Sequence, residues 1–276
     1  MYKTAYLTDV GLKRKVNEDA LLVAEACNLF VVADGMGGHD KGEVASRMVV
    51  ESFQQMLCAD EDSTVTYSDE GDEDETIPYF DENHEDATVA YNDSFEKKNQ
   101  LNATLNRVIE LSTNKIKTYA KEKLFSGQIG TTVVGLYKLK DEDEMALFHL
   151  GDSRVYRVRD ATIEKLTTDH SKYEQMKQSG KYNEKELAKV NRNSITKAVG
   201  NFKVMPLEIS YISLKSQDIY ILCSDGVSDL THAKELLLMI EKEKNNLKNV
   251  IFNIKKLVYE RGAKDNLSII VFKYEA

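Results

Sequence analysis

The sequence predicts an α+β fold in which antiparallel sheets carry helices on their outer faces. The β-prone segments are grouped along the chain and so are the helical ones, whereas a βαβ fold would alternate them. The 276 residues are enough to bury one substantial core, and neither of the two prolines suggests a rigid linker. We therefore predict a single domain over residues 1–276.

The first sixty residues predict three strands followed by a helix. The three apolar, β-prone segments are separated by turn residues and cover residues 4–10, 20–26 and 28–34. From Gly42 the apolar residues recur at helical spacing, so a helix is expected up to about Leu57.

An acidic segment follows this helix. Residues 60–93 contain fourteen Asp or Glu and no Lys or Arg, while elsewhere 37 basic residues outnumber the remaining 32 acids. One segment thus accounts for the net charge of −9. Like charges and few aliphatic residues cannot offset the entropy of ordering, so we expect a mobile insertion at about 60–95. Three interpretations compete: a solvated loop, a docking segment for a basic partner, and a pseudosubstrate or metal-capturing segment.

The second half of the chain repeats the grouping of strands and helices. A long amphipathic helix is expected over about 101–120. Four strands should follow, at 131–139, 144–150, 153–159 and 161–166. Residues 171–200 are polar and helical in pattern, which is typical of a peripheral segment. The chain should then form a buried strand within 218–226, two helices over about 232–261 and a closing strand at 266–274.

Composition excludes several classes of protein. Cys27, Cys58 and Cys223 match neither a disulfide framework nor a zinc spacing, and Cys223 lies in an apolar run typical of a core residue. Unpaired cysteines favour a reducing cytoplasm. The N-terminus has no secretory leader pattern, and no apolar run approaches the ~20 residues of a membrane span. Without a long basic run, we expect no nucleic-acid partner and no membrane partner.

Four acidic residues lie at the ends of predicted strands. Asp34 and Asp225 each end an apolar run, Asp152 follows another, and Asp265 precedes the last strand. A single Asp-Gly pair is common in turns, but four carboxylates that converge would repel one another. A hard divalent cation such as Mg²⁺ or Mn²⁺ prefers oxygen ligands and would offset this repulsion. Gly35, which has no side chain, would let its carbonyl approach such an ion.

The motifs around these acids resemble those of the metal-dependent protein phosphatases, the protein phosphatase 2C family, in its bacterial form. The similar segments occur in family order from about residue 5 to 273 and read "GLKRKVNEDA", "VVADGMGGHDKGEVAS", "IGTTVVGLY", "HLGDSRVYRV", "TTDHS", "ITKAVG", "ILCSDGVSD" and "KDNLSIIVF". Each alone is only suggestive, and the eight in order form the resemblance.

The resemblance implies a four-layer αββα sandwich with a binuclear Mn²⁺ or Mg²⁺ centre at one end. It also implies a phosphoserine/phosphothreonine protein phosphatase, in which a metal-bridging water or hydroxide attacks phosphorus in line with the leaving oxygen. By motif position, Asp34 would bridge two metals and the Gly35 carbonyl would bind one of them. Asp225 and Asp265 would complete the ligands of the other.

Further residues receive roles by the same resemblance. Asp152 matches a position that helps to hold a third, weaker metal, and Glu18 and Asp19 match acids that hold metal-bound waters. Arg14 matches the arginine that binds the substrate phosphate. Residues 171–200 match the flap that borders the cleft, although a solvated helical hairpin without function is an alternative.

One position departs from the pattern of many eukaryotic members. They have a histidine directly after the metal-bridging Asp-Gly pair, where this chain has Met36. His39, three residues on, could act as the general acid or be an ordinary loop residue, so the general acid is unassigned.

Two other function classes compete with this one. A non-catalytic binding module could keep the fold, but degenerate relatives usually lose metal acids that are all present here. Nucleotide binding by the glycines near Gly35 fails, because Asp40 stands where G-x-G-x-x-G needs its last glycine. The expected partners are phosphoserine and phosphothreonine proteins, including a serine/threonine kinase and its substrates.

Overall fold

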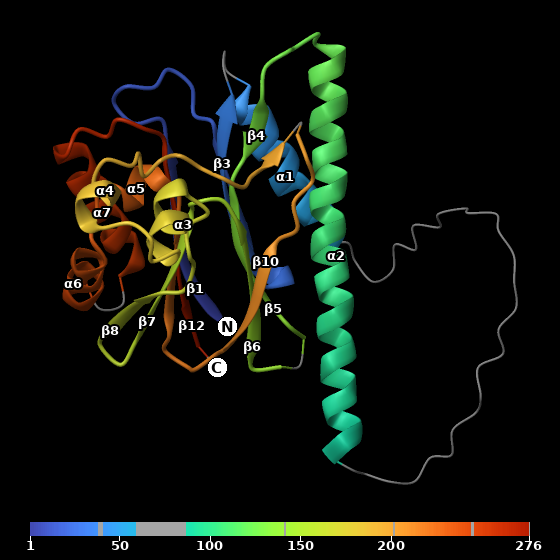
Figure 1. The fold of residues 1–276 in the computed structure, drawn as a ribbon. Helices are drawn as coiled ribbons and strands as arrows, with labels where there is room; N and C mark the ends of the chain where they lie inside the picture. The colour runs from blue at the N-terminus through green and yellow to red at the C-terminus, as the bar shows by residue number, and fades with distance from the viewer. Residues whose placement is uncertain (38–40, 59–86, 141, 201, 244–245, 276) are drawn as a thin grey trace, which may run out of the picture.

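The computed structural model describes residues 1–37, 41–58, 87–140, 142–200, 202–243 and 246–275, with only the backbone for 87–93 (Figure 1). His39 and most of the acidic segment lie outside the described residues. In the described part of the chain, no helix is both long enough and apolar enough to cross a membrane.

Two antiparallel sheets form the centre of the fold. Within the described residues, the first sheet has five strands in the order β1 (Tyr2–Asp9), β12 (Leu267–Tyr274), β11 (Ile219–Cys223), β7 (Arg154–Arg159) and β8 (Thr162–Lys165). The second sheet has seven strands, with β2 (Asp19–Ala24) paired to β3 beside the path β10 (Glu208–Ser213), β6 (Glu144–Leu150), β5 (Val133–Lys138), β3 (Leu29–Gly37), β4 (Ile129–Thr131) and β9 (Val199–Gly200). The predicted fold class is confirmed.

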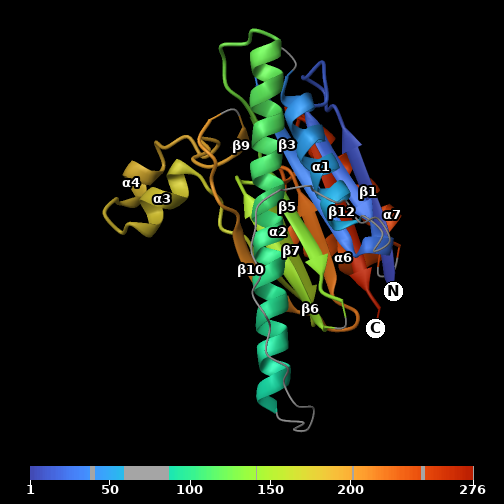
Figure 2. The same cartoon turned by 90° about the vertical axis from the view of Figure 1, so that its right-hand side faces the viewer.

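Helices cover the outer face of each sheet (Figures 1 and 2). α1 (Gly42–Leu57) and α2 (Ala87–Glu122) pack on the seven-stranded sheet. α5 (Asp225–Ser228), α6 (Ala233–Glu243) and α7 (Leu247–Glu260) pack on the five-stranded sheet. Figure 1 shows the resulting four layers, with α2 at one side and α6 and α7 at the other.

Apolar side chains fill the space between the layers. Phe30 of β3 stacks on Phe272 of β12 across the two sheets, with ring centroids 4.1 Å apart. On the helical side, Phe53 of α1 stacks on Phe148 of β6 at 4.8 Å. Burying a side chain of this size stabilises a fold by about 1.5–3 kcal/mol, so these contacts fix the sheets relative to each other and to α1.

Two of the following segments differ from the sequence-based expectation, and a third agrees with it. The edge strand β10 was not predicted, because its residues are mostly exposed or half-buried and form no apolar run. α2 begins at Ala87, so the last part of the predicted 60–95 insertion is helical. The segment between residues 171 and 200 has the peripheral helices that its pattern predicts, α3 (Lys172–Gln178) and α4 (Glu184–Leu187), which project from the sheets in Figure 2.

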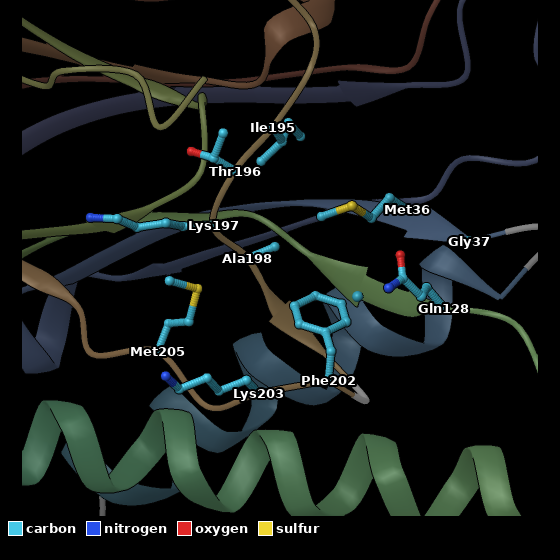
Figure 3. Close-up of a pocket in the computed structure, with 11 residues that line it drawn as sticks. Met36, Gly37, Gln128, Ile195, Thr196, Lys197, Ala198, Phe202, Lys203 and Met205 are labelled. Atoms are coloured by element: carbon cyan, nitrogen blue, oxygen red, sulfur yellow. The ribbon is translucent and has the colours of Figure 1, made fainter. Parts of the chain in front are cut away.

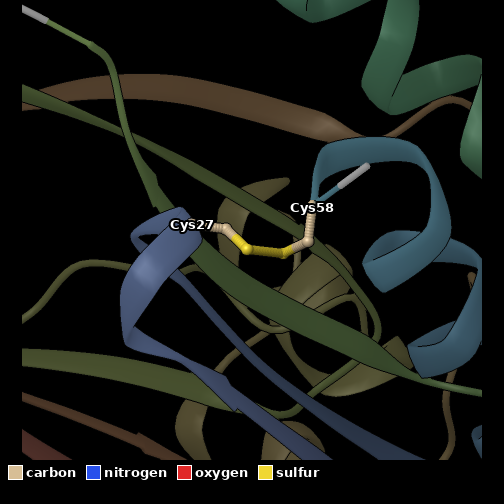
Figure 4. The surroundings of a disulfide bond; sticks show 2 residues. All are labelled: Cys27 and Cys58. Carbon is tan, nitrogen blue, oxygen red and sulfur yellow. A yellow bond between two sulfur atoms is a disulfide. The ribbon is translucent and has the colours of Figure 1, made fainter. Parts of the chain in front are cut away.

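The structure also pairs two cysteines that were expected to be unpaired. Cys27 and Cys58 form a disulfide with a Cα–Cα distance of 5.4 Å (Figure 4), whereas Cys223 is a buried free thiol, as predicted. The spacing of the two cysteines in the sequence does not predict the pair. Cys27 ends η1 (Glu25–Cys27), just before β3 begins, and α1 runs in the opposite direction to β3, so that Cys58 follows its last residue. Nine strand residues span roughly 30 Å and sixteen helical residues roughly 24 Å, so the end of α1 returns near the start of β3. The expectation of a reducing cytoplasm thereby loses the observation on which it rested.

Candidate functional site

The register of β2 and β3 brings two acids together. Asp19, the first residue of β2, pairs directly with Asp34, near the end of β3. Thr131 and Thr132 hold the backbone of Asp34, because Thr132 Oγ1 accepts from the Asp34 N–H at 3.2 Å and Thr131 Oγ1 donates to its carbonyl at 2.9 Å. The "GTT" motif therefore fixes the strand end that carries Asp34.

The five-stranded sheet supplies two more acids at the same end. Asp225 follows β11 as the first residue of α5, and Asp265 lies two residues before β12. Ser224 connects the two sheets here, since its Oγ donates to Asp19 Oδ2 at 2.9 Å and accepts from the Ser268 N–H at 3.0 Å. Acids from both sheets thus meet at one end of the sandwich.

One cavity of about 330 Å³ collects most of the predicted site residues. It is lined by Arg14, Glu18, Asp34, Gly35, Met36, Gly37, Asn193, Ile195, Asp225 and Asp265. Asn193 and Ile195 show that the end of the predicted flap borders this acid cavity. His39 lies outside the described residues, so its role stays a prediction.

Asp152 lines a neighbouring cavity of about 240 Å³, which it shares with Asp169, Asp229 and side chains of α3. Asp225 and Asn193 line both cavities, so the two are adjacent. The structure therefore brings Asp152 close to the other acids without including it in their cavity.

Burial and mutual repulsion raise the pKa of these carboxyl groups. Burial, followed by the charges of Asp225 and Asp265, raises the pKa of Asp19 to about 7, even though hydrogen bonds from serines oppose the shift. Burial and the nearby acids raise the pKa of Asp152 to about 7 and that of Asp225 to about 6. The pKa of Asp34 is raised well above its ordinary value by burial and by Asp19. Without further positive charge, these carboxyl groups are therefore not all ionised at neutral pH.

The cluster fits divalent cations by the chemistry of its donors. Among the described residues, Asp19 Oδ1 and Asp152 Oδ1 are buried oxygens without a hydrogen-bond partner. Such a loss of hydration is costly unless a cation or a water compensates for it. The surrounding donors are carboxylate and carbonyl oxygens, which Mg²⁺ and Mn²⁺ prefer.

Arg14 faces the acids from the loop between β1 and β2. Its Nη2 donates to Asp265 Oδ2 at 2.8 Å, and its Nη1 lies 3.8 Å from Glu18 Oε2. These carboxylates raise the pKa of the guanidinium, and its side chain is 48% exposed. The guanidinium is therefore held at the acid cavity and keeps an accessible edge.

Asn266 is a positioning residue that the sequence reading missed. Its side chain is buried; Oδ1 accepts from the Glu18 N–H at 2.9 Å, and Nδ2 donates to the carbonyls of Val10 and Val16, each at 3.0 Å. These bonds attach the loop that carries Arg14 to the strand that follows Asp265. An Asn directly after the candidate ligand in "KDN" was the available clue.

Gly35 allows the backbones of three segments to approach one another. A Cβ at this position would lie under 3.0 Å from the carbonyl oxygens of Gly42 and Glu18. The Gly35 N–H donates to the Glu18 carbonyl at 3.1 Å, and Glu18 Oε1 accepts from the Gly42 N–H at 3.0 Å. A larger residue would separate α1 from the acid cavity.

Comparisons with known proteins agree with this geometry. The sequence model of a family described as protein phosphatase 2C matches residues 13–260. The serine/threonine phosphatase stp of Listeria welshimeri is 25% identical over 271 residues, which cover 96% of this chain and 93% of that protein.

Solved structures share the fold. The Mycobacterium tuberculosis serine/threonine phosphatase PstP/Ppp superposes with a TM-score of 0.77 at 22% identity, over 100% of this chain and 99% of that one. A catalytic domain of PstP in complex with two manganese ions gives a TM-score of 0.72 at 22% identity, over 100% of this chain and 99% of that one.

Proposed function

The chain belongs to the protein phosphatase 2C family of metal-dependent serine/threonine protein phosphatases, and we propose that its acid cavity hydrolyses phosphoserine and phosphothreonine in proteins. The reaction transfers the phosphoryl group to water: the oxygen of water bonds to phosphorus, and the bond to the serine or threonine oxygen breaks. The convergence of Asp34, Asp225 and Asp265 with Arg14 in one cavity carries the proposal.

Asp34, the Gly35 carbonyl, Asp225 and Asp265 would hold two Mn²⁺ or Mg²⁺ ions. Bound there, such ions lower the pKa of water and offset negative charge on the phosphate. The two manganese ions in the related PstP structure support this number. The unpartnered Oδ1 of Asp152 supports a further, weaker site in the neighbouring cavity.

Arg14 would bind the phosphate of the substrate. A guanidinium presents two parallel N–H groups to phosphate oxygens and remains charged at all working pH values. Asp265 and Glu18 hold the Arg14 side chain at the cavity before substrate arrives, which reduces the entropy lost on binding.

Glu18 and Asp19 would act by orienting groups around the metals. Asp19 is fixed by Ser224, and Glu18 is fixed through its backbone by Asn266 and through its carboxylate by Gly42. Met36 has no proton to donate, so the leaving oxygen must take its proton from another group.

The substrates we propose are phosphoproteins, including a serine/threonine kinase and its targets. The flap residues Asn193 and Ile195, which line the acid cavity, would contact the protein substrate. The related proteins described as serine/threonine phosphatases support this class.

Hydrolysis of a phosphothreonine peptide by the purified chain tests the proposal. We expect hydrolysis that requires Mn²⁺ or Mg²⁺ and falls by at least about a hundredfold in Asp225→Asn. Asp160→Asn is the matched control, because Asp160 is exposed in the β7–β8 turn, in a left-handed conformation that Asn tolerates. Full activity of the wild type in excess chelator would contradict the proposal. Peptide binding without any hydrolysis would favour the binding-module alternative.

A further inference from the structure

A second cavity of about 490 Å³ opens beside the acid cavity (Figure 3). Met36, Gly37 and Ile195 line both cavities, so the two are adjacent. The other lining residues are Gln128, Gly130, Thr196, Lys197, Ala198, Phe202, Lys203 and Met205. The "ITKAVG" motif therefore forms one wall of a cavity that the proposed chemistry does not use.

One wall of this second cavity is apolar and held in place. The Phe202 ring lies over two glycines that pair across β4 and β9, Gly130 and Gly200. A Cβ on Gly200 would lie under 3.0 Å from the ring, and one on Gly130 would lie 3.1 Å from it. Figure 3 shows Met36 across the cavity from this ring. The ring is thus positioned before any ligand binds.

Two lysines give the same cavity a positive side. Lys197 and Lys203 extend toward one side, with Met205 between them (Figure 3). Within the part of the chain that the structure describes, neither ammonium group forms a hydrogen bond or an ion pair. An acidic ligand would meet the Lys203 charge without displacing an acidic neighbour, whereas the Lys197 charge already helps to lower the pKa of the Glu208 carboxyl.

We propose that the second cavity binds the substrate polypeptide next to the phosphorylated residue and selects a large apolar side chain with an acidic residue beside it. This proposal rests on the proposed function, since a substrate chain bound at the acid cavity would run past the adjacent second cavity, which shares three lining residues with it. The volume lies within the roughly 300–1,000 Å³ typical of ligand pockets and is enough for a Phe or Leu side chain and a neighbouring carboxylate.

Phosphothreonine peptides that differ at one position test this preference in the wild-type chain. Phe and Ala are compared at each position within about four residues of the phosphothreonine, a reach of roughly 13 Å, with Glu or Gln as the next residue. We expect one position at which Phe raises kcat/KM by about tenfold over Ala, and Glu raises it further over Gln.

Variants of the cavity should reduce these ratios. Phe202→Ala and Met205→Ala should each bring the ratio of kcat/KM for the Phe peptide to kcat/KM for the Ala peptide closer to one. Met205→Ala tests the cavity while the Phe202 ring stays in place over Gly130 and Gly200. Phe252→Ala is the matched control, because Phe252 is 66% exposed on α7 in the opposite layer and should leave the ratio unchanged. A ratio that survives in both cavity variants would overturn the proposal.

The charge preference has its own test. In Lys203→Glu, kcat/KM should be higher for the Gln peptide than for the Glu peptide, the reverse of the wild type. Lys234→Glu makes the same change of charge at an exposed position on α6 and should keep the wild-type preference. A reversal in both variants would indicate a general effect of net charge and would overturn this part of the proposal.

Peptide affinity separates the subsite from the chemistry. Fluorescence anisotropy of the same peptides in chelator should give a Kd about tenfold lower for the preferred Phe peptide. Hydrolysis without any sequence preference in either measurement would overturn the inference and leave the proposed function. A Phe preference in affinity without hydrolysis in Mn²⁺ would overturn the proposed function and leave the inference of a peptide subsite.

Discussion

Reduction of the Cys27–Cys58 disulfide is expected to destabilise the fold. The bond joins residues separated by 31 positions, and this loop contains β3 and α1. In the chain-entropy view, an open loop of this length gives the unfolded chain more conformations than a closed one. With about 31 residues in the loop, the expected loss at 25 °C is about 3.7 kcal/mol of unfolding free energy.

Urea unfolding of the purified chain, with and without dithiothreitol, measures this loss. An m-value of about 3 kcal/mol/M, at the upper end for small proteins, converts it into a fall of about 1 M in the midpoint. The control is the double variant Cys27→Ser/Cys58→Ser, which should unfold near the reduced midpoint and not respond to the reductant. Coincident midpoints for the oxidised and reduced wild type, or two free thiols at these positions after air oxidation, would refute the reasoning.

Three further outcomes follow from the acid cavity and its supports. Because the folded pKa values of Asp19, Asp152 and Asp225 (about 7, 7 and 6) exceed the ordinary value, the folded state binds more protons. The Tm of the protein in chelator should therefore fall from about pH 4 to pH 8, and Mn²⁺ should reduce that fall; a flat profile in calorimetry would contradict the shifts. Arg14→Ala should lower kcat/KM on phosphopeptides by about 10–100-fold, with Arg14→Lys intermediate because it cannot bind two oxygens in parallel; equal rates for all three would exclude phosphate binding by Arg14. Asn266→Ala should lower the free energy of unfolding by about 2–4 kcal/mol in urea, because it leaves buried backbone groups unpaired. Asn266→Asp should cost at least as much, because a carboxylate keeps the acceptor for the Glu18 N–H but has no donor for the Val10 and Val16 carbonyls and adds a buried charge; a smaller loss for Asp than for Ala would contradict this origin.

The sequence could locate Asp34 and Asp225 because each ends an apolar run that only a buried strand explains. It could not reveal that Asp19 lies directly opposite Asp34. That pairing depends on the turn between β2 and β3, in which Asn28 adopts a left-handed conformation with φ 56°. A turn longer by one residue would move Asp19 to the other face of the sheet.

The cavity lined by Phe202 could not be predicted from the sequence, for a different reason. Its residues come from a strand end, a short strand and a loop that are distant in the sequence, and none carries an unusual pattern alone. Gly130 precedes a predicted strand and Gly200 ends the segment predicted at 171–200, and neither position predicts the Phe202 ring that lies above both glycines. The Cys27–Cys58 pair was missed likewise, because it depends on the lengths of β3 and α1.

The stacked rings of Phe30 and Phe272 have a consequence for the distant acids. Phe30 shares a strand with Asp34, and Phe272 lies on the strand that begins just after Asp265. The two rings therefore fix the position of one sheet relative to the other. A lateral shift between the sheets would change the distances between Asp34, on one sheet, and Asp265, beside the other. Substitutions of Phe30 or Phe272 should weaken cation affinity even where the protein still folds.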